Sequence, residues 1–512
     1  MGAVFIGGLV AAAAPSAADV PGAPPDASAP QSETISDEPC WFSQPGGREV
    51  RCGVLTVPES RDGHNARMLR LRFVRFRAAA QTSLEPVVNI SGGPGAPAGL
   101  DGAAIGRWSR WIERENWLRD RDFVLFDQRG VGQSEPNMSC PELEDAAAKV
   151  FAGPPSPDAA DALWARSAAA CAKRLAAEGV DLQAYNTAAI VADLGSLLDR
   201  LGEQSWILLA ESYGTRVAMQ VAIAEPARIH ALILDSVDPP NVGEYVTAAP
   251  AAASAFTSIF QLCAAQMPCS EAFPELALSF DQLLRRATTK PVPVPISRAD
   301  GAPFSAALDD GRLLEVLMQS FYEPQRLDEL PAAIAAASSG RYDALAPLLQ
   351  IVLHQYSSDG VSLGLHLSVE CHDEFPFASR EAVARASSHA PLFRRFALSI
   401  LPLAACPAWP AGAAPSEERS PTRIAAPSLI LSGTLDPVTP PLASAVREQW
   451  FQNSFAVTFP GAGHGVLGGD ACASRIVEAF LADDQRAPNQ DCVHTLATPK
   501  FKTSSVGGSI AK

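Results

Sequence analysis

The chain has 512 residues, of which 47% are hydrophobic and 19% are charged, the composition of an ordinary globular protein. This composition excludes wholesale disorder, and the length predicts one large domain with insertions or two to three domains. The 40 Lys and Arg residues against 56 Asp and Glu residues give a net charge of −16, which repels phosphate backbones and anionic lipid headgroups. We therefore expect no nucleic-acid partner, and the sequence leaves the oligomeric state open.

The N-terminus has features of an export signal. Ala3 to Ala14 is a short apolar run followed by small residues that signal peptidase accepts, although no Lys or Arg precedes it. We expect a signal peptide over residues 1–18 and a secreted or periplasmic protein. Residues 19–39 and 496–512 are expected to form a flexible leader and a flexible tail. Beyond the signal, no run reaches the roughly 18 apolar residues that span a bilayer, so no membrane insertion is expected.

The 10 cysteines support the same compartment. Their number is even and none lies in a CxxC pair, which favours five disulfides over a zinc site. We expect sequential pairing, because each neighbouring couple would close a short local loop. Cys371–Cys406 and Cys472–Cys492 are the pairs we favour most. Reduced, buried thiols are the alternative.

Short apolar runs alternate with helical patterns along much of the chain. Apolar residues and arginines largely alternate over residues 69–76. This period of two predicts an outer strand with one face exposed to solvent. Later runs are expected to be strands buried on both faces of a parallel sheet: 86–90, 123–126, 206–209, 231–234, 428–431 and 455–459. Helical patterns at 190–201 and 213–224 lie between them. The alternation predicts an α/β fold, with a mostly parallel central sheet flanked by helices.

The regular alternation is interrupted over residues 240–424. This stretch is rich in alanine, has helical patterns and carries three prolines in five residues, starting at Pro291. We interpret it as a helical cap inserted into the core. The two parts of the core are then expected at residues 40–239 and 425–495.

A serine follows the strand predicted at residues 206–209. Ser212 lies in Ala210-Glu-Ser-Tyr-Gly214, directly before a helical pattern, which is the context of a nucleophile elbow. Such a turn strains the serine backbone and lifts its hydroxyl above the sheet, while small flanking residues let strand and helix pass closely. Ala210 replaces the usual glycine and adds only a methyl group. A helix N-cap serine is the alternative interpretation.

A glycine-rich loop, Ser91-Gly-Gly-Pro-Gly95, follows the strand predicted at residues 86–90. Its unshielded amides at Gly92 and Gly93 are candidates to bind a developing oxyanion, together with the amide of Tyr213 after the nucleophile. An ordinary Gly-Pro turn is the alternative. A phosphate loop is excluded, because no Gly-Lys-Ser/Thr follows the glycines.

The candidate base and acid follow the last two predicted strands. Asp436 follows the strand predicted at residues 428–431, and His464 lies on a glycine-rich stretch after the strand predicted at residues 455–459. A lone histidine is more often structural. The order Ser, Asp, His is that of the hydrolase fold. His464 would take the proton of Ser212, and Asp436 would orient and stabilise the imidazole. Asp235 and Asp238, after the strand at 231–234, are the competing acids.

Together these motifs resemble those of the α/β-hydrolase-fold serine peptidases of the proline iminopeptidase and tripeptidyl aminopeptidase (TAP-like) group. The matching motifs are Ser91-Gly-Gly-Pro-Gly95, Asp127-Gln-Arg-Gly-Val-Gly-Gln-Ser134, Glu211-Ser-Tyr-Gly-Thr215, Gly433-Thr-Leu-Asp436 and Gly463-His-Gly465. The resemblance implies the α/β-hydrolase fold and hydrolysis of peptides from the N-terminus. Ser91 stands where proline iminopeptidases usually carry His, and Ala210 replaces glycine, which weakens the substrate assignment. We interpret Asp127 and Arg129 as parts of a structural turn.

Recognition of a free α-ammonium group requires carboxylates near the nucleophile. Glu370 and Glu374 would share one face of a helix and form an amine anchor, and Glu211 is a third candidate. A solvated acidic helix end is the alternative. A metal site in this segment is not expected, because adjacent side chains point apart and Cys371 is expected in a disulfide.

The sequence therefore predicts a secreted serine hydrolase that needs no cofactor. We expect an aminopeptidase of prolyl or tripeptidyl type, acting on peptides through an acyl-enzyme on Ser212. The alternative enzyme is an esterase or amidase for a small ester, lactone or xenobiotic amide. The alternative outside enzymology is a catalytically silent, hydrolase-like binding protein, against which the complete triad argues.

Overall fold

The computed structural model describes residues 32–63, 65–79, 84–153, 156–297, 303–442, 444–469, 471–496 and 498–503. The expected signal peptide and most of the expected leader lie outside the described residues.

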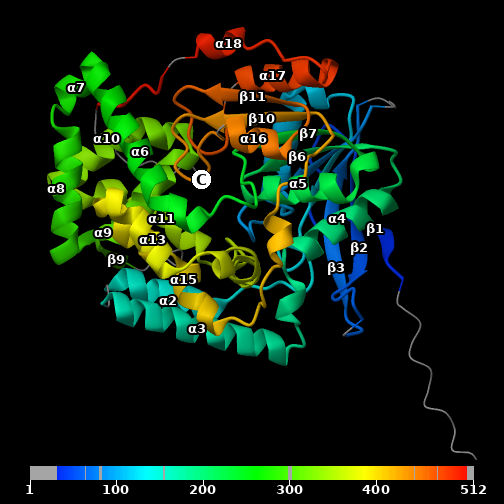
Figure 1. Ribbon diagram of the computed structural model, residues 1–512, viewed down its shortest axis with the longest axis horizontal. Coiled ribbons are helices and arrows are strands. Elements are labelled where there is room, and N and C mark those ends of the chain that lie inside the picture. Colours follow the sequence, from blue (N-terminus) through cyan, green and yellow to red (C-terminus); the bar gives the residue numbers. More distant parts are fainter. Residues whose placement is uncertain are drawn as a thin grey trace, which may run out of the picture. The chain divides into compact units, whose positions relative to one another are not determined.

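Nine strands form one mixed sheet, in the order β1-β2-β3-β5-β4-β6-β7-β10-β11 (Figure 1). The strands are β1 (Thr34–Glu38), β2 (Val50–Pro58), β3 (Met68–Phe76), β4 (Val87–Ile90), β5 (Phe123–Phe126), β6 (Trp206–Glu211), β7 (Ile229–Asp235), β10 (Ser428–Gly433) and β11 (Ser454–Phe459). From β5 to β11 every neighbouring pair is parallel, and the pairs from β1 to β5 through β2 and β3 are antiparallel. The predicted α/β class and the apolar central strands are confirmed.

Side chains of the central strands alternate between two apolar clusters, one on each face of the sheet. Leu208 of β6 belongs to one cluster, and Ile207 and Leu209 belong to the other. The first face is covered by α4 (Thr187–Leu201) and α5 (Tyr213–Ala224), and the second by α1 (Gly102–Arg114) and α17 (Ala471–Ala482). Helices α16 (Ser444–Trp450) and α18 (Asp491–His494) complete the C-terminal part. Burial on both faces explains why these strands are apolar throughout.

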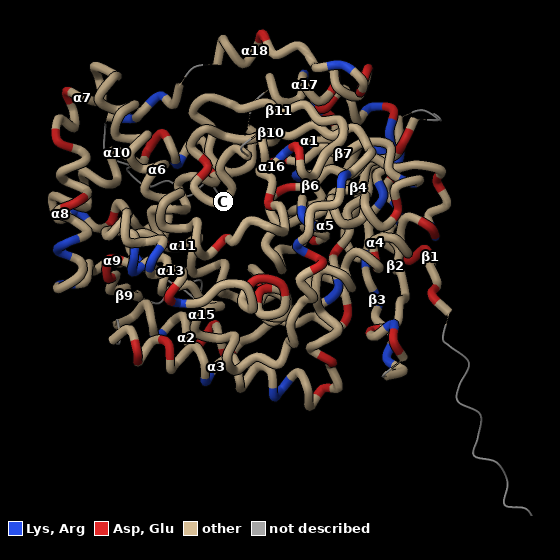
Figure 2. The backbone as a smooth tube through the Cα atoms, viewed as in Figure 1, with Lys and Arg blue, Asp and Glu red and all other residues tan. Residues whose placement is uncertain are grey.

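The expectation of an outer strand at residues 69–76 was wrong in its position. β3 lies inside the sheet, because β1 and β2 extend the sheet beyond it. Its arginines are paired: Arg72 contacts Glu38 of β1 at 2.7 Å, and Arg75 contacts Asp122 at 2.5 Å. Basic and acidic positions are interspersed over the described fold (Figure 2). The polar face of β3 therefore reflects ion pairing rather than a place at the edge.

Both expected flexible ends include ordered segments. Residues 34–38, which the sequence places in the leader, form β1. Every residue of β1 pairs with β2. Residues 498–503, placed in the tail, pack on the fold: Phe501 is buried, and the Lys502 N–H donates to the Asp328 carbonyl at 2.9 Å. Backbone hydrogen bonds and one buried ring order these segments, and neither depends on a periodic apolar pattern.

The insertion between β7 and β10 lies to one side of the sheet, green to yellow in Figure 1. Its helices are α6 (Glu244–Ala265), α7 (Met267–Ala272), α8 (Leu276–Thr289), α9 (Asp310–Met318), α10 (Pro324–Ser338), α11 (Ala346–Gln355), α12 (Leu363–Val369), α13 (Arg380–Ala386), α14 (Arg394–Leu398) and α15 (Leu401–Ala405), and a π-helical turn follows α12 at Glu370–Glu374. Among the described helices, α6 has the length and composition of a possible membrane span. Its Phe256 and Ile259 are buried in the apolar cluster of the fold.

The insertion is not wholly helical as expected. The prolines that begin at Pro291 lie in and before β8 (Val292–Ser297), which among the described strands pairs only with β9 (Pro303–Leu308). Val292 and Val294 point inward while Pro293 and Pro295 are exposed. Proline lacks a backbone N–H, so an isolated hairpin with free edges accommodates it.

A second insertion also contributes to this region. Between β5 and β6, α2 (Pro141–Ala152) and α3 (Pro157–Ala177) pack on each other, and they contact β9 and α15 of the larger insertion. The sequence pattern places these helices in the core, expected at residues 40–239. Their tertiary contacts place them with the cap.

All five disulfides form, with the sequential pairing that was predicted. They are Cys40–Cys52, Cys140–Cys171, Cys263–Cys269, Cys371–Cys406 and Cys472–Cys492. The linked cysteines are between 6 and 35 residues apart in the sequence.

Candidate active site

Ser212 lies at a strained turn between β6 and α5. Its φ of 55° is unusual for a residue other than glycine, and its N–H donates to the Asp235 carbonyl at 3.0 Å. A Cβ atom at Gly214 would lie 2.3 Å from the carbonyl oxygen of Ile90, so only glycine fits there. Ala210 is buried without requiring glycine. The local geometry is that of a strand passing tightly into a helix, with the serine at the bend.

The imidazole of His464 is bound to the carboxylate of Asp436. The Nδ1 atom lies 2.9 Å from Oδ2 and 3.0 Å from Oδ1, and both side chains are buried. The N–H groups of Val438 and Thr439 donate to the same carboxylate at 2.9 Å. Burial alone would raise the pKa of Asp436, but His464 and these donors hold it below its ordinary value. Burial alone would lower the pKa of His464, but Asp436 raises it above its ordinary value.

One cavity brings Ser212 and His464 together. Its volume is about 460 Å³, and Gly92 and Gly93 line it beside the serine. A Cβ atom at Gly92 would lie 3.0 Å from the Cβ of Ser212, so the glycine-rich loop runs directly along the nucleophile turn. Tyr213 begins α5, and its ring is buried with its hydroxyl group 2.8 Å from that of Thr187. The candidate oxyanion amides therefore lie on the two segments that flank the serine.

The competing acids are engaged elsewhere. Asp235 accepts the N–H groups of Val466 and Leu467, each at 2.7 Å. Asp238 pairs with Arg216 at 3.0 Å. The carboxylate in contact with the imidazole is that of Asp436.

The structure separates the two glutamates that were predicted to act together. Glu370 lines the cavity, as does Glu211. Glu374 lines neither of the two described cavities that include Ser212, and it pairs instead with Arg216 at 2.5 Å and Arg419 at 2.7 Å. The expectation that Glu374 faces the site was therefore wrong, because two guanidinium groups hold its carboxylate.

Two residues of α6 line the cavity in place of Glu374, and the sequence did not predict them: Glu244 and Tyr245. Glu244 lines the same cavity as Ser212, and the Tyr245 hydroxyl group donates a hydrogen bond to the Glu370 carboxylate. Burial, with the nearby charges of Asp238 and Glu374, raises the pKa of Glu244 to about 7. Burial, with Glu244 and Glu374, raises the pKa of Glu370 well above its ordinary value. An acidic residue at a helix start is common on dipole grounds, so the sequence carried no distinctive signal.

Tyr322 and His366 are further cavity residues without a sequence signal. The Tyr322 ring meets that of His464 edge to face, with centroids 5.0 Å apart. The Nδ1 atom of His366 lies 3.2 Å from the carbonyl oxygen of Pro94 in the glycine-rich loop. Burial lowers the pKa of His366 to about 4, so this imidazole is neutral near pH 7.

Asp127 and Arg129 make contacts within the fold. The Asp127 carboxylate accepts the N–H groups of Ala98 and Gln133 at 2.8 and 2.7 Å, which ties the motif to the chain after the glycine-rich loop. Arg129 forms two hydrogen bonds to Asp193, at 2.6 and 2.7 Å, and both side chains have zero exposure. These contacts favour the structural interpretation of the motif.

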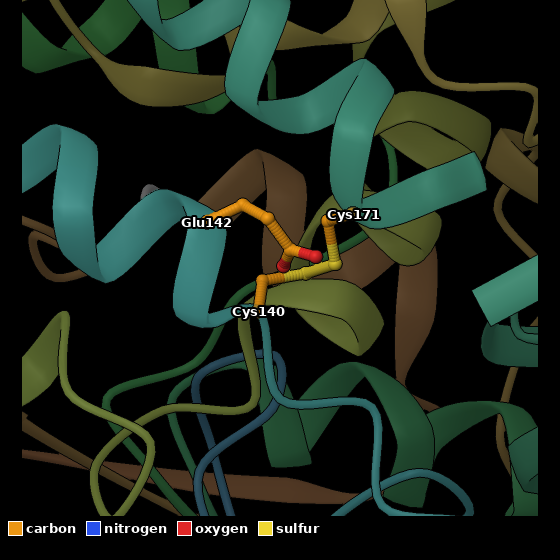
Figure 3. Close-up of side chains that lie close together, drawn as sticks. All are labelled: Cys140, Glu142 and Cys171. Atoms are coloured by element: carbon orange, nitrogen blue, oxygen red, sulfur yellow. A yellow bond between two sulfur atoms is a disulfide. The ribbon is translucent and has the colours of Figure 1, made fainter. Parts of the chain in front are cut away.

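One group of possible metal ligands lies together in the part of the chain that the structure describes: Cys140, Glu142 and Cys171 (Figure 3). The two sulfur atoms are bonded to each other, so neither offers a thiolate. Glu142 pairs with Arg174 at 2.8 Å. This donor set does not fit a metal ion.

Comparisons with known proteins agree with this architecture. A family model described as the alpha/beta hydrolase fold matches residues 85–264, and one described as TAP-like protein matches residues 390–493. The serine protease Hip1 of Mycobacterium tuberculosis is 26% identical over 483 residues, which cover 88% of this chain and 89% of that protein. The tripeptidyl aminopeptidase of Streptomyces lividans is 27% identical over 204 residues, 38% of this chain and 36% of that protein.

Among solved structures, the proline iminopeptidase of Mycobacterium smegmatis matches with a TM-score of 0.35 at 13% identity, covering 84% of this chain and 98% of that one. The family models and the curated relatives carry the assignment. The chain therefore has the α/β-hydrolase fold, and its residues 390–493 are similar to those of TAP-like proteins.

Proposed function

We propose that this protein is an exported aminopeptidase that uses Ser212, His464 and Asp436. The observation that carries the proposal is the composition of the active-site cavity, where Ser212 and His464 are accompanied by four glutamates, Glu211, Glu244, Glu315 and Glu370. A serine hydrolase for neutral substrates does not need this acidic lining. The five disulfides support folding in an oxidising compartment.

In the proposed reaction, His464 takes the proton of the Ser212 hydroxyl as its oxygen attacks the scissile carbonyl carbon. Asp436 holds the imidazole tautomer and stabilises the imidazolium ion. The amides of Gly93 and Tyr213 stabilise the oxyanion, each contributing about 3 to 4 kcal/mol. His464 then gives the proton to the leaving amine, and water hydrolyses the acyl-enzyme by the same route in reverse.

The glutamates recognise the free N-terminus of the substrate in this proposal. Glu244 is half-buried and Glu370 is buried, and both have raised pKa values because they are desolvated close to other carboxylates. A bound ammonium ion relieves this repulsion and favours the ionised carboxylates. The cavity therefore gains charge complementarity only when a cation enters.

Substrate panels test the proposal. Free aminoacyl or tripeptidyl nitroanilides should be cleaved faster than their N-acetylated counterparts, and the preference should fall in Glu244→Gln and Glu370→Gln. The Glu374→Gln variant is a matched control that should keep the preference, because Glu374 pairs with two arginines. Equal rates on free and blocked amides would contradict the amine anchor. Covalent labelling by a fluorophosphonate should be absent in Ser212→Ala.

An esterase or amidase is the second candidate. Apolar residues of the cap, Phe396, Ile400 and Leu401, line the same cavity and suit an uncharged acyl group. Faster turnover of nitrophenyl esters than of free-amine nitroanilides, with no effect of Glu244→Gln, would favour this candidate.

A further inference from the structure

The last residue of β7 is hydrogen-bonded to both segments that carry the proposed nucleophile and base. The carbonyl oxygen of Asp235 accepts the N–H of Ser212 at 3.0 Å. Its side-chain Oδ2 accepts the N–H groups of Val466 and Leu467, each at 2.7 Å. Asp235 is 2% exposed, so water does not compete for these bonds. One buried residue thus connects the turn that carries Ser212 to the segment that directly follows His464.

The next residue continues the same connection. The hydroxyl oxygen of Ser236 accepts the N–H of Gly465 at 2.9 Å, and the Ser236 N–H donates to the Leu431 carbonyl of β10 at 2.9 Å. Ser236 has a φ of 58°, a conformation that serine seldom adopts and that persists where surrounding structure enforces it. The N–H groups of the three residues after His464 therefore all donate to the side chains of the adjacent residues Asp235 and Ser236.

The histidine loop, residues 461–465, is rich in glycine. Residues 461–465 contain three glycines, which leave the backbone free to sample many conformations. On the cap side, the N–H of His464 donates to the Phe321 carbonyl at 2.8 Å. The opposite side is held by Asp235 and Ser236. The position of the imidazole therefore depends on anchors outside the loop.

We propose that Asp235 and Ser236 are positioning residues that set the distance between the Ser212 hydroxyl and the His464 imidazole. The inference rests on the proposed function. It gives Asp235 a role distinct from that of the triad acid, because both oxygens of Asp436 already lie at hydrogen-bond distance from His464.

Asp235 also acts on the imidazole through its charge. Burial, with the neighbouring charge of Glu211, raises the pKa of Asp235 to about 7. The groups around the imidazole are Asp436, Glu211, Asp235, Glu244 and Tyr322. Burial lowers the pKa of His464, and Asp436, Glu211 and Asp235 raise it. Removing one of these charges should lower the histidine pKa.

Three variants separate position from charge. Asp235→Ala removes the acceptor and should lower kcat about 10- to 100-fold with KM changed less than about twofold, since misplacement of a catalytic group slows chemistry. Asp235→Asn keeps an acceptor, so it should restore kcat to within about fivefold of wild type. Its acid limb of kcat/KM should move to lower pH. Ser236→Ala keeps the backbone conformation and should lower kcat about 3- to 10-fold.

Asp122→Asn is the matched control for loss of a buried carboxylate. Asp122 precedes β5 at the amino ends of the parallel strands, where it accepts the Ala78 N–H and pairs with Arg75. This variant should lose stability while keeping kcat per fluorophosphonate-labelled site. A folded Asp235→Ala protein with wild-type kcat and labelling rate would overturn the inference.

If Asp235→Ala does not fold, the other two variants decide. Wild-type kcat in Ser236→Ala together with an unmoved pH profile in Asp235→Asn would overturn the inference. Failure of the proposed function is distinguishable: without the proposed serine nucleophile the wild-type protein would not be labelled or Ser212→Ala would still be labelled, and without aminopeptidase specificity free and N-blocked amides would be cleaved at equal rates. If fluorophosphonate labelling requires Ser212 but its rate is unchanged in Asp235→Ala, only the positioning role is rejected.

Discussion

Replacing Asp193 with alanine should destabilise the protein without slowing each active site. Arg129 and Asp193 are both fully buried and joined by two hydrogen bonds of 2.6 and 2.7 Å. Removing one partner of such a pair leaves an uncompensated buried charge and costs about 3 to 5 kcal/mol. The remaining partners of Arg129, the carbonyl oxygens of Glu59 and Ala184, accept hydrogen bonds but carry no full charge. The free energy of unfolding should fall by this amount.

Urea unfolding followed by tryptophan fluorescence measures the loss, with kcat expressed per fluorophosphonate-labelled site. Arg61→Ala is the control: Arg61 contacts Asp193 at 2.9 Å but is 30% exposed, so its loss should cost less than about 1 kcal/mol. Replacing the pair by Arg129→Met with Asp193→Leu should recover most of the stability. If Asp193→Ala lowered kcat per site and left the unfolding free energy unchanged, the structural interpretation of the Asp127–Ser134 motif would be refuted.

Three further predictions address the site and the cap. Because burial raises the pKa of Glu244 to about 7, KM for free-amine substrates should rise as pH falls below 7, when the carboxylate takes up a proton. The KM of N-blocked substrates should not change, and a parallel rise for both would contradict the assignment. Gly92→Ala places a methyl group 3.0 Å from the Cβ of Ser212, so kcat should fall at least about 10-fold at unchanged unfolding midpoint; an unaltered kcat would exclude this loop from the oxyanion site. Replacing Cys371 and Cys406 by serine opens a link of 35 residues and should cost about 3 to 4 kcal/mol in urea unfolding, less than reduction of all five disulfides in the wild-type protein; an unchanged unfolding free energy would contradict a stabilising role for this link.

Much of the fold followed from patterns contained within a few residues. The strand cores were visible because parallel strands covered on both faces must be apolar, and the nucleophile turn was visible because small residues stand two positions before and two positions after Ser212. The disulfide pairing followed from short loop closure. The order Ser212, Asp436, His464 came from the positions of three motifs after three strands.

The strands and turns that shape this protein were therefore determined locally by its sequence, because strand burial and tight turns impose steric demands within a few residues. The acidic lining of the cavity was decided only by tertiary structure. Glu244 and Glu370 come from distant parts of the insertion, and Glu374 is turned away by two arginines. Such choices depend on which buried charges meet when helices pack, and no spacing along the chain encodes that encounter.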